Sequence, residues 1–335
     1  MRSFLIRRLV GLVFVLVGVS LVTFILSHVL PADPARVALG GKAGAEQYEA
    51  MREQMGLDRP LYVQYAVYVG NLLHGDLGYS YTSKRPVRDD LLDYFPASLE
   101  LMTVALILAA SVAIPLGVLS AARPGRQVDR VATLLTVFGA AMPLFLLGLL
   151  FQVVFYKQLG WLPATGRIDV QLGEPNRITG LFTVDSLLTG DWPRFANSLK
   201  HLILPAVTLA MPATAILLQM VRTSMIESLR RDYVRTARSK GIAERQVIYG
   251  HALRNALLPT LTSFGLLIGA LLSGAFLVEV VYTFPGLGMY VLNAILRSEF
   301  SAIISTTLLV AAVYVVANVL VDVAYVLVDP RIRYA

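Results

Sequence analysis

The stretch LMTVALILAASVAIPLGVLSAA, residues 101–122, contains 22 consecutive residues without a charged side chain or a histidine. As an α-helix it would be about 33 Å long, which matches the hydrocarbon core of a bilayer at about 30 Å. The composition agrees, because 56% of the 335 residues are hydrophobic and 15% are charged, whereas about a quarter of a soluble domain is charged. This stretch therefore predicts an integral membrane protein.

Five further windows of the same kind lie along the chain, and together with the first they predict an all-α, polytopic protein with six transmembrane helices. A seventh uncharged window, residues 280–296, contains Pro285, Gly286 and Gly288, which predict a partly inserted loop followed by a short helix. The first window could instead be a signal sequence, but its apolar run is long and lacks a small-residue cleavage site. The five further windows are residues 9–27, 131–156, 202–221, 255–278 and 300–321.

The distribution of charge predicts the orientation. With the N-terminus inside, the short inner segments carry a net charge of +10 and the outer segments −3, which is the positive-inside bias. The basic balance therefore reflects topology, and we expect no nucleic-acid partner. Both termini should be cytoplasmic. The expected organisation is a first helix in residues 1–30, an extracytoplasmic segment in 31–96 and a five-helix core in 97–335 with an outer loop at 157–201 and a cytoplasmic loop at 222–254.

The cytoplasmic loop contains DYVRTARSKG, residues 232–241. Asp232 is a plausible N-cap of a short helix, and Gly241 suits the position that ends it. A second helical stretch over residues 243–257 should stop at Pro259. Such a helix–Gly–helix hairpin predicts a docking surface for a cytoplasmic partner, although its arginines could also serve topology alone.

This hairpin resembles the coupling motif of ABC importer permeases, in particular the dipeptide/oligopeptide/nickel branch, and HALRNALLP at residues 251–259 extends the resemblance. The family motif usually begins Glu-Ala-Ala, whereas this chain has Arg235, Thr236 and Ala237, as is typical of the peptide branch. In order along the chain, the other matching stretches are RRL at 7–9, PADP at 31–34, GLDRP at 56–60, HGDLG at 74–78, MP at 142–143, NRITG at 176–180, FPGLG at 284–288 and DPRIR at 329–333.

The resemblance to B-type, dipeptide permease-like subunits implies a type I importer permease fold in a bacterial or archaeal inner membrane. It implies a homologous second permease as heterodimer partner, two cytoplasmic ATPases that hold ATP and Mg, and an extracytoplasmic solute-binding protein. It also implies an outer-loop motif formed by Glu279, Phe284, Pro285, Gly286 and Gly288. The ATPase-coupling residues that it implies are Asp232, Tyr233, Arg235, Thr236, Ala237, Arg238 and Gly241.

Polar and small residues inside the spans are candidates for a translocation pathway. Gln219 and Thr262 could line it or could form ordinary interhelical hydrogen bonds. Gly265, Gly269 and Ser273 recur every four residues, which permits close helix approach. This stripe could be a pathway face, a face between permease subunits or an internal packing face.

The chain carries no motif for chemistry of its own. Gly41 and Lys42 are followed by Ala43 and lack the upstream glycine of a P-loop, so ATP must be bound by partners. There are no cysteines and four scattered histidines, so we expect no metal site, no bound cofactor and no catalytic residue.

Nickel-complex or glutathione transport within the same family stays open. An ion-coupled secondary carrier is the alternative from another class, but it would need mid-membrane carboxylates, and Asp322 stands alone.

Overall fold

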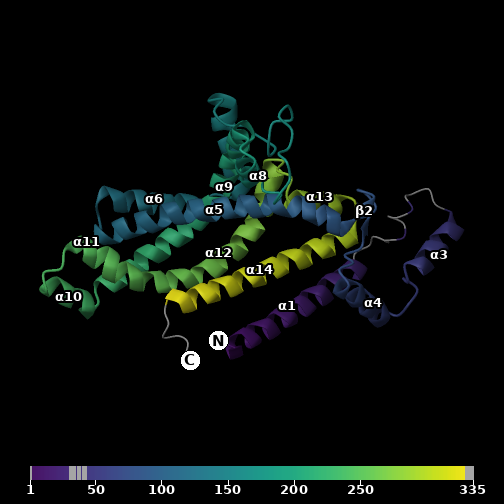
Figure 1. Cartoon of the computed structure of the whole chain (residues 1–335), viewed down its shortest axis with the longest axis horizontal. Coiled ribbons are helices and arrows are strands. Elements are labelled where there is room, and N and C mark those ends of the chain that lie inside the picture. The colour runs from purple at the N-terminus through teal and green to yellow at the C-terminus, as the bar shows by residue number, and fades with distance from the viewer. Residues whose placement is uncertain (1, 30–34, 36–38, 40–43, 329–335) are drawn as a thin grey trace. The chain divides into compact units, whose positions relative to one another are not determined.

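The computed structural model describes residues 2–29, 35, 39 and 44–328. Apart from a two-stranded hairpin of β1 (Tyr79–Ser80) and β2 (Arg85–Pro86), its regular structure is helical, which confirms the all-α prediction (Figure 1). The chain divides into two compact units, each described by itself below. Unit 1 contains Met1–Ala97 and Pro285–Val315, and unit 2 contains Ser98–Phe284 and Val316–Ala335.

Unit 1 is held together by a small apolar core. Val87 and Leu91 pack with Leu287, Tyr290 and Ala302 in one buried cluster. These residues come from the two sequence ends of the unit, so their burial joins segments about 200 residues apart. Its helices are α1 (Arg2–Val29), α3 (Ala45–Gln54), α4 (Leu61–Leu73), the start of α5 (Val87–Ala122), α13 (Leu287–Leu296) and the first half of α14 (Phe300–Val328).

Two buried carboxylates complete this core. Glu299 accepts a hydrogen bond from Ser80 Oγ at 2.9 Å. Asp90 accepts bonds from Ser83 Oγ at 2.7 Å and from the Tyr290 hydroxyl at 3.1 Å. Because a buried carboxylate is costly without partners, these bonds determine how the β1–β2 hairpin lies on the helices.

Unit 2 is organised around α9 (Trp192–Leu229), which is more fully buried than α5 or α12 (Leu253–Val281). The helices α6 (Gln127–Ala141), α7 (Leu144–Phe151), α8 (Phe182–Leu188) and α12 all pack against it. The remaining elements of unit 2 are η1 (Gln152–Gln158), α10 (Asp232–Ser239), α11 (Glu244–Gln246), η2 (Val247–Ala252), the later part of α5 and the end of α14.

Glycines let neighbouring helices approach α9 closely. A Cβ on Gly117 of α5 would lie 2.8 Å from Val221 Cγ1. A Cβ on Gly139 of α6 would lie 2.8 Å from the backbone oxygen of Met211. Small residues at such crossings allow van der Waals packing, which holds helices together where lipid surrounds them.

The predicted spans all fall in helices, with one correction. Within the described residues, four helices are long and apolar enough to cross a membrane, or five if the bent pair α6–α7 counts as one span. The predicted single helix over residues 131–156 is wrong, because α6 and α7 meet at an angle of 110°. Met142 adopts an extended backbone between them, since the following Pro143 disfavours a helical conformation at the preceding residue. The count of six spans stays a prediction.

The contact at Gly139 predicts a stability effect. Gly139→Ala places a methyl group against the backbone of α9, so we expect it to destabilise the protein by about 1–3 kcal/mol, as overpacking does. The matched control is Gly18→Ala in α1, where no atom of the described chain lies within 4 Å of the new Cβ. Thermal unfolding in detergent measures both variants, and equal midpoints for the two would contradict the close packing.

Candidate functional site

The first helix of the hairpin after α9, α10, is ended by Gly241 as predicted. Gly241 has φ +75°, a conformation that glycine adopts without strain. Its N–H donates to the Arg238 carbonyl at 2.9 Å, and the Ile242 N–H donates to the Ala237 carbonyl at 3.3 Å. These two bonds form a Schellman motif, which turns the chain sharply away from α10.

The predicted N-terminal cap of α10 is wrong. Asp232 is the first residue of the helix, the N-cap position is occupied by Arg231, and no side chain caps it. The Asp232 carboxylate instead lies 3.5 Å from the Arg235 guanidinium, one turn along the helix. An acidic group in the first turn still interacts favourably with the helix dipole.

The hairpin has one buried side and one exposed side. Val234 and Ala237, three residues apart, are buried, as are Val247 and Ala252 of η2, the element against which α10 packs. Ala237 therefore belongs to the internal contact of the hairpin. The exposed members of the predicted coupling set are Asp232, Tyr233, Arg235, Thr236, Arg238 and Gly241.

The second arm of the hairpin differs from the prediction. The chain continues from α11 through η2, a π-helical turn, directly into α12. Pro259 lies inside α12 and does not end a helix there. A proline is tolerated in a membrane helix because local π adjustments and neighbouring helices satisfy the backbone groups that it frees. The hairpin therefore continues into α12 without a break in the helical backbone.

The base of the hairpin is tied to α9. Ser228 Oγ donates to the Ala252 carbonyl at 2.9 Å and is also hydrogen-bonded to the Tyr233 hydroxyl. These contacts join the end of α9, the start of α10 and the end of η2 at one point. A pocket of about 410 Å³ lies beside this junction, lined by Ser224, Glu227, Ser228, Arg231, Tyr233, Asn255, Ala256 and Pro259.

An ion pair closes the turn of the hairpin. Arg238 Nε donates to Glu244 Oε2 at 3.0 Å, and its Nη2 donates to Oε1 at 2.6 Å. The hydrogen bonds from Arg238 lower the pKa of the Glu244 carboxyl, and the Glu244 carboxylate raises the pKa of the Arg238 guanidinium. The family resemblance implied a coupling role for Arg238, and the structure shows that its guanidinium is paired within the hairpin.

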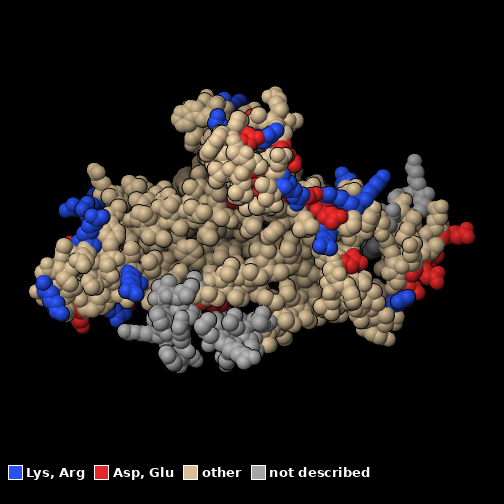
Figure 2. Space-filling view, in the orientation of Figure 1, with Lys and Arg blue, Asp and Glu red and all other residues tan. Residues whose placement is uncertain are grey.

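A second ion pair ties the same end of unit 2 together. Arg222 of α9 donates through Nε to Asp129 Oδ1 of α6 at 2.8 Å, and Ser120 Oγ of α5 donates to the same oxygen at 2.5 Å. The turn between α5 and α6 therefore lies at the end of unit 2 that bears the hairpin. Figure 2 shows Lys and Arg atoms gathered over this end. The sequence indicated only that the segments 123–130 and 222–254 are both basic, and the structure shows that they lie at the same end of unit 2.

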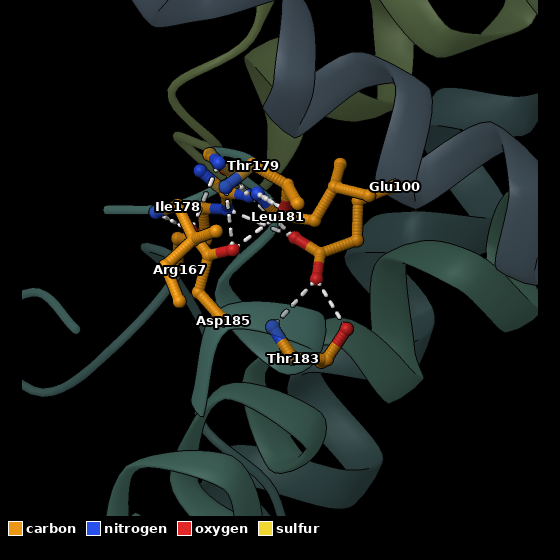
Figure 3. Close-up of polar contacts among 8 residues, drawn as sticks. Glu100, Arg167, Ile178, Thr179, Leu181, Thr183 and Asp185 are labelled. Atoms are coloured by element: carbon orange, nitrogen blue, oxygen red, sulfur yellow. Dashed lines mark hydrogen bonds and ion pairs between the residues drawn. The ribbon is translucent and has the colours of Figure 1, made fainter. Parts of the chain in front are cut away.

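The loop of residues 157–201 contains a buried polar network (Figure 3). Arg167 Nη2 donates to Glu100 Oε2 at 2.5 Å and to the Gly180 carbonyl at 2.8 Å. Asp185 accepts bonds from the backbone N–H groups of Thr179 and Gly180, both at 2.8 Å. Burial raises the pKa of the Asp185 carboxyl, but these and neighbouring hydrogen bonds outweigh it and lower the pKa. The network fixes the NRITG turn on α5.

The predicted outer-loop motif is divided between the units. In unit 2, Glu279 is buried and accepts a bond from Ser98 Oγ at 2.6 Å. The N–H of Phe284 donates to the Glu279 carbonyl at 2.8 Å, and the Phe284 ring is fully buried. In unit 1, Pro285 precedes Gly286, which is the N-cap of α13, and Gly288 is buried in its first turn. The loop and short helix predicted for this window are therefore present.

The predicted pathway residues differ in their surroundings within the chain. Gly265 is packed inside the chain, since a Cβ there would lie 2.6 Å from Asn318 Oδ1. Ser273 and Gln219 are exposed, and Gly269 is half-buried. The side chain of Thr262 lies outside the described part of the structure. The small-residue stripe therefore starts as an internal packing face and ends at an exposed surface.

Comparison with known proteins extends over the whole chain. This chain is 44% identical over 330 residues to the Probable D,D-dipeptide transport system permease protein of Escherichia coli, and the match covers 98% of this chain and 97% of that one. It is 41% identical to a di/tripeptide transport system permease protein of Pseudomonas aeruginosa, covering 100% and 99%. A glutathione transport system permease protein of Escherichia coli is 36% identical over both full lengths.

Two family models match consecutive parts of the sequence. Residues 1–102 match the N-terminal part of binding-protein-dependent transport system membrane components. Residues 113–334, which include the whole hairpin, match the model of the inner membrane component itself. The chain belongs to the family of binding-protein-dependent transport system inner membrane components.

Proposed function

We propose that this chain is the permease subunit of an ATP-driven importer of dipeptides and other short peptides. The observation that carries the proposal is full-length similarity, at 38–44% identity, to permeases named for dipeptide transport. The glutathione permeases are similar over the same length at 36% identity, so glutathione is the second candidate cargo. An ion-coupled secondary carrier would be outside this family.

In this proposal the hairpin receives the energy of ATP hydrolysis. Its exposed residues, among them Tyr233, Arg235 and Thr236, dock against a cytoplasmic ATPase. The buried pair Val234 and Ala237 keeps α10 on η2, so that α10 moves as part of the junction. Since η2 is continuous with α12 and α12 packs along α9, a displacement of the hairpin moves both central helices.

The Arg222–Asp129 pair extends this movement. It joins α9 to α6 and, through Ser120, to α5. The Asp129 side chain is only 12% exposed and that of Arg222 is 34% exposed, and a mostly buried carboxylate is costly without its partner, so we expect the two helices to remain coupled during the cycle. ATP and Mg belong to two ATPase subunits in this scheme, and a homologous permease and an extracytoplasmic binding protein complete the transporter.

The proposed topology keeps both termini and the hairpin in the cytoplasm, with residues 31–96 and 157–201 outside. The basic end of unit 2 then faces the cytoplasm. The half-buried Gly269 and the exposed Ser273 and Gln219 would face the pathway or the second permease. Gly265 would contribute to the internal packing of α12.

The left-handed residue that ends α10 gives the first test. Gly241→Val places a β-branched residue at φ +75°, where it is strained by about 1 kcal/mol or more. We expect the variant to insert normally but to lose ATPase co-purification and peptide uptake. Gly241→Asn is the control, because asparagine adopts this conformation and no described atom lies within 4 Å of the new Cβ. Full assembly and uptake with valine would contradict the docking role.

A charge exchange separates docking from hairpin shape. Arg238→Glu breaks the pair with Glu244 and reverses a charge on the docking surface, whereas the double variant Arg238→Glu/Glu244→Arg restores the internal pair with opposite polarity. We expect both variants to bind the ATPases weakly, with a defect that depends on salt because exposed charges are screened within about 10 Å at 0.1 M salt. Co-purification at two salt concentrations measures this. Full recovery in the double variant would show that Arg238 acts only on hairpin shape.

Reconstitution tests the cargo. The chain, its second permease, the ATPases and the binding protein are placed in proteoliposomes, and uptake of a radiolabelled dipeptide is measured with and without internal ATP. We expect ATP-dependent dipeptide uptake that excess unlabelled dipeptide abolishes and excess glutathione leaves intact. Uptake of glutathione without uptake of dipeptide would favour the second candidate.

A further inference from the structure

Helix α4 in the outer segment is apolar, and much of its surface is exposed in the described part of the chain. Its 13 residues include no charged side chain, and none of the 13, all of which the structure describes, is buried within the chain. Leu61, Tyr62, Val67 and Leu73 are 58%, 76%, 48% and 83% exposed. A helix that is apolar on nearly all sides is unstable in water unless another surface covers it. The question is which surface does so.

Aromatic contacts hold α4 against the second half of α1. The Tyr65 hydroxyl lies 2.9 Å from Ser20 Oγ. The Phe24 ring meets the Tyr65 ring edge-on, with centroids 5.3 Å apart, and stacks on the Tyr68 ring at 5.9 Å. Ser20 and Phe24 are themselves buried. All of these residues belong to unit 1, and Figure 1 shows α4 beside the end of α1 that lies away from the N-terminus.

These contacts determine the depth of α4. Ser20 is seven residues before Ser27, the end of the apolar window of α1, so it lies about 10 Å inside the outer end of that span. The hydroxyl of Tyr65 must lie at the same depth as its partner. Yet α4 is about 20 Å long, too short to cross a hydrocarbon core of about 30 Å. The helix can therefore enter the membrane from one side but cannot span it.

The ends of α4 agree with this position. Asp58 and Arg59 precede it, and His74 and Asp76 follow it, so charge appears only where the chain leaves the helix. Tyr62, in the first turn of α4, suits the boundary between headgroups and acyl chains, where the ring is apolar and the hydroxyl is wet. A soluble protein docking from outside would not reach a surface that lies below the headgroups.

We propose that α4 lies within the outer leaflet of the membrane, with Tyr62, Val67 and Leu73 in contact with lipid. The inference rests on the proposed topology, in which α1 spans the bilayer. It divides residues 31–96 into a part in water, which includes α3, and a part in lipid. The membrane thereby supplies the apolar surface that unit 1 does not provide for α4, and α4 anchors the outer end of α1.

Because the chain has no cysteine, single-cysteine variants with a nitroxide label can measure this directly. Tyr62→Cys, Val67→Cys and Leu73→Cys report on α4. Val17→Cys on the exposed side of α1 is the lipid control, and Glu46→Cys on α3 is the water control. Each label is exposed to oxygen and to a water-soluble nickel chelate, in phosphatidylcholine–phosphatidylglycerol liposomes, for the full-length chain alone and together with its second permease. We expect the α4 labels to collide with oxygen rather than nickel, as at Val17, in both samples.

Three outcomes would overturn the inference. Nickel access at α4 with oxygen access at Val17 would place α4 in water and leave the proposed topology intact. Access of neither reagent to α4 once the second permease is present would make the cover a protein surface. Nickel access at Val17 itself would reject the span of α1, and the proposed topology would fail together with the inference.

Discussion

The constraint on which this structure depends is the absence of water from the hydrocarbon core of a bilayer. Every backbone group there must be satisfied within the protein, which leaves helices as the available form for this chain. For the same reason, buried polar side chains near the helix ends are hydrogen-bonded or ion-paired within the protein. Asp129 meets Arg222 and Ser120 where α5, α6 and α9 converge, and Glu100 meets Arg167 where α5 meets the loop of residues 157–201.

We expect the Arg167–Glu100 pair, which is buried on both sides, to contribute more to specificity than to net stability. Taking both charges of a pair out of water costs about as much as their attraction returns, whereas removing one partner costs about 3–5 kcal/mol. Arg167 therefore selects one arrangement of the loop of residues 157–201, because its guanidinium also lies 3.7 Å from the centroid of the Phe182 ring and donates to the Gly180 carbonyl. Buried polar contacts therefore fold this loop, just as they join the helix ends of unit 2.

Close packing around α9 then makes unit 2 suitable for transmitting movement. Gly117 and Gly139 bring α5 and α6 against α9 at distances that leave no room for a methyl group. The hairpin joins this block through Ser228 and through the uninterrupted passage of η2 into α12. A packed interior is not continuously deformable, so force applied at α10 should move whole helices, as the proposed coupling requires.

The sequence by itself determined the class of the protein, the positions of the apolar helices and the glycine that ends α10. These features depend on local properties: length, charge and the conformations that glycine allows. The tertiary structure decided the bend of 110° at Met142 and the continuation of α12 through Pro259. It also showed that Arg231, and not Asp232, occupies the N-cap position of α10. It also decided that Arg238 pairs with Glu244 and Arg167 with Glu100. Pairing across distance in the chain depends on which surfaces meet after folding, and that information is absent from local residue patterns.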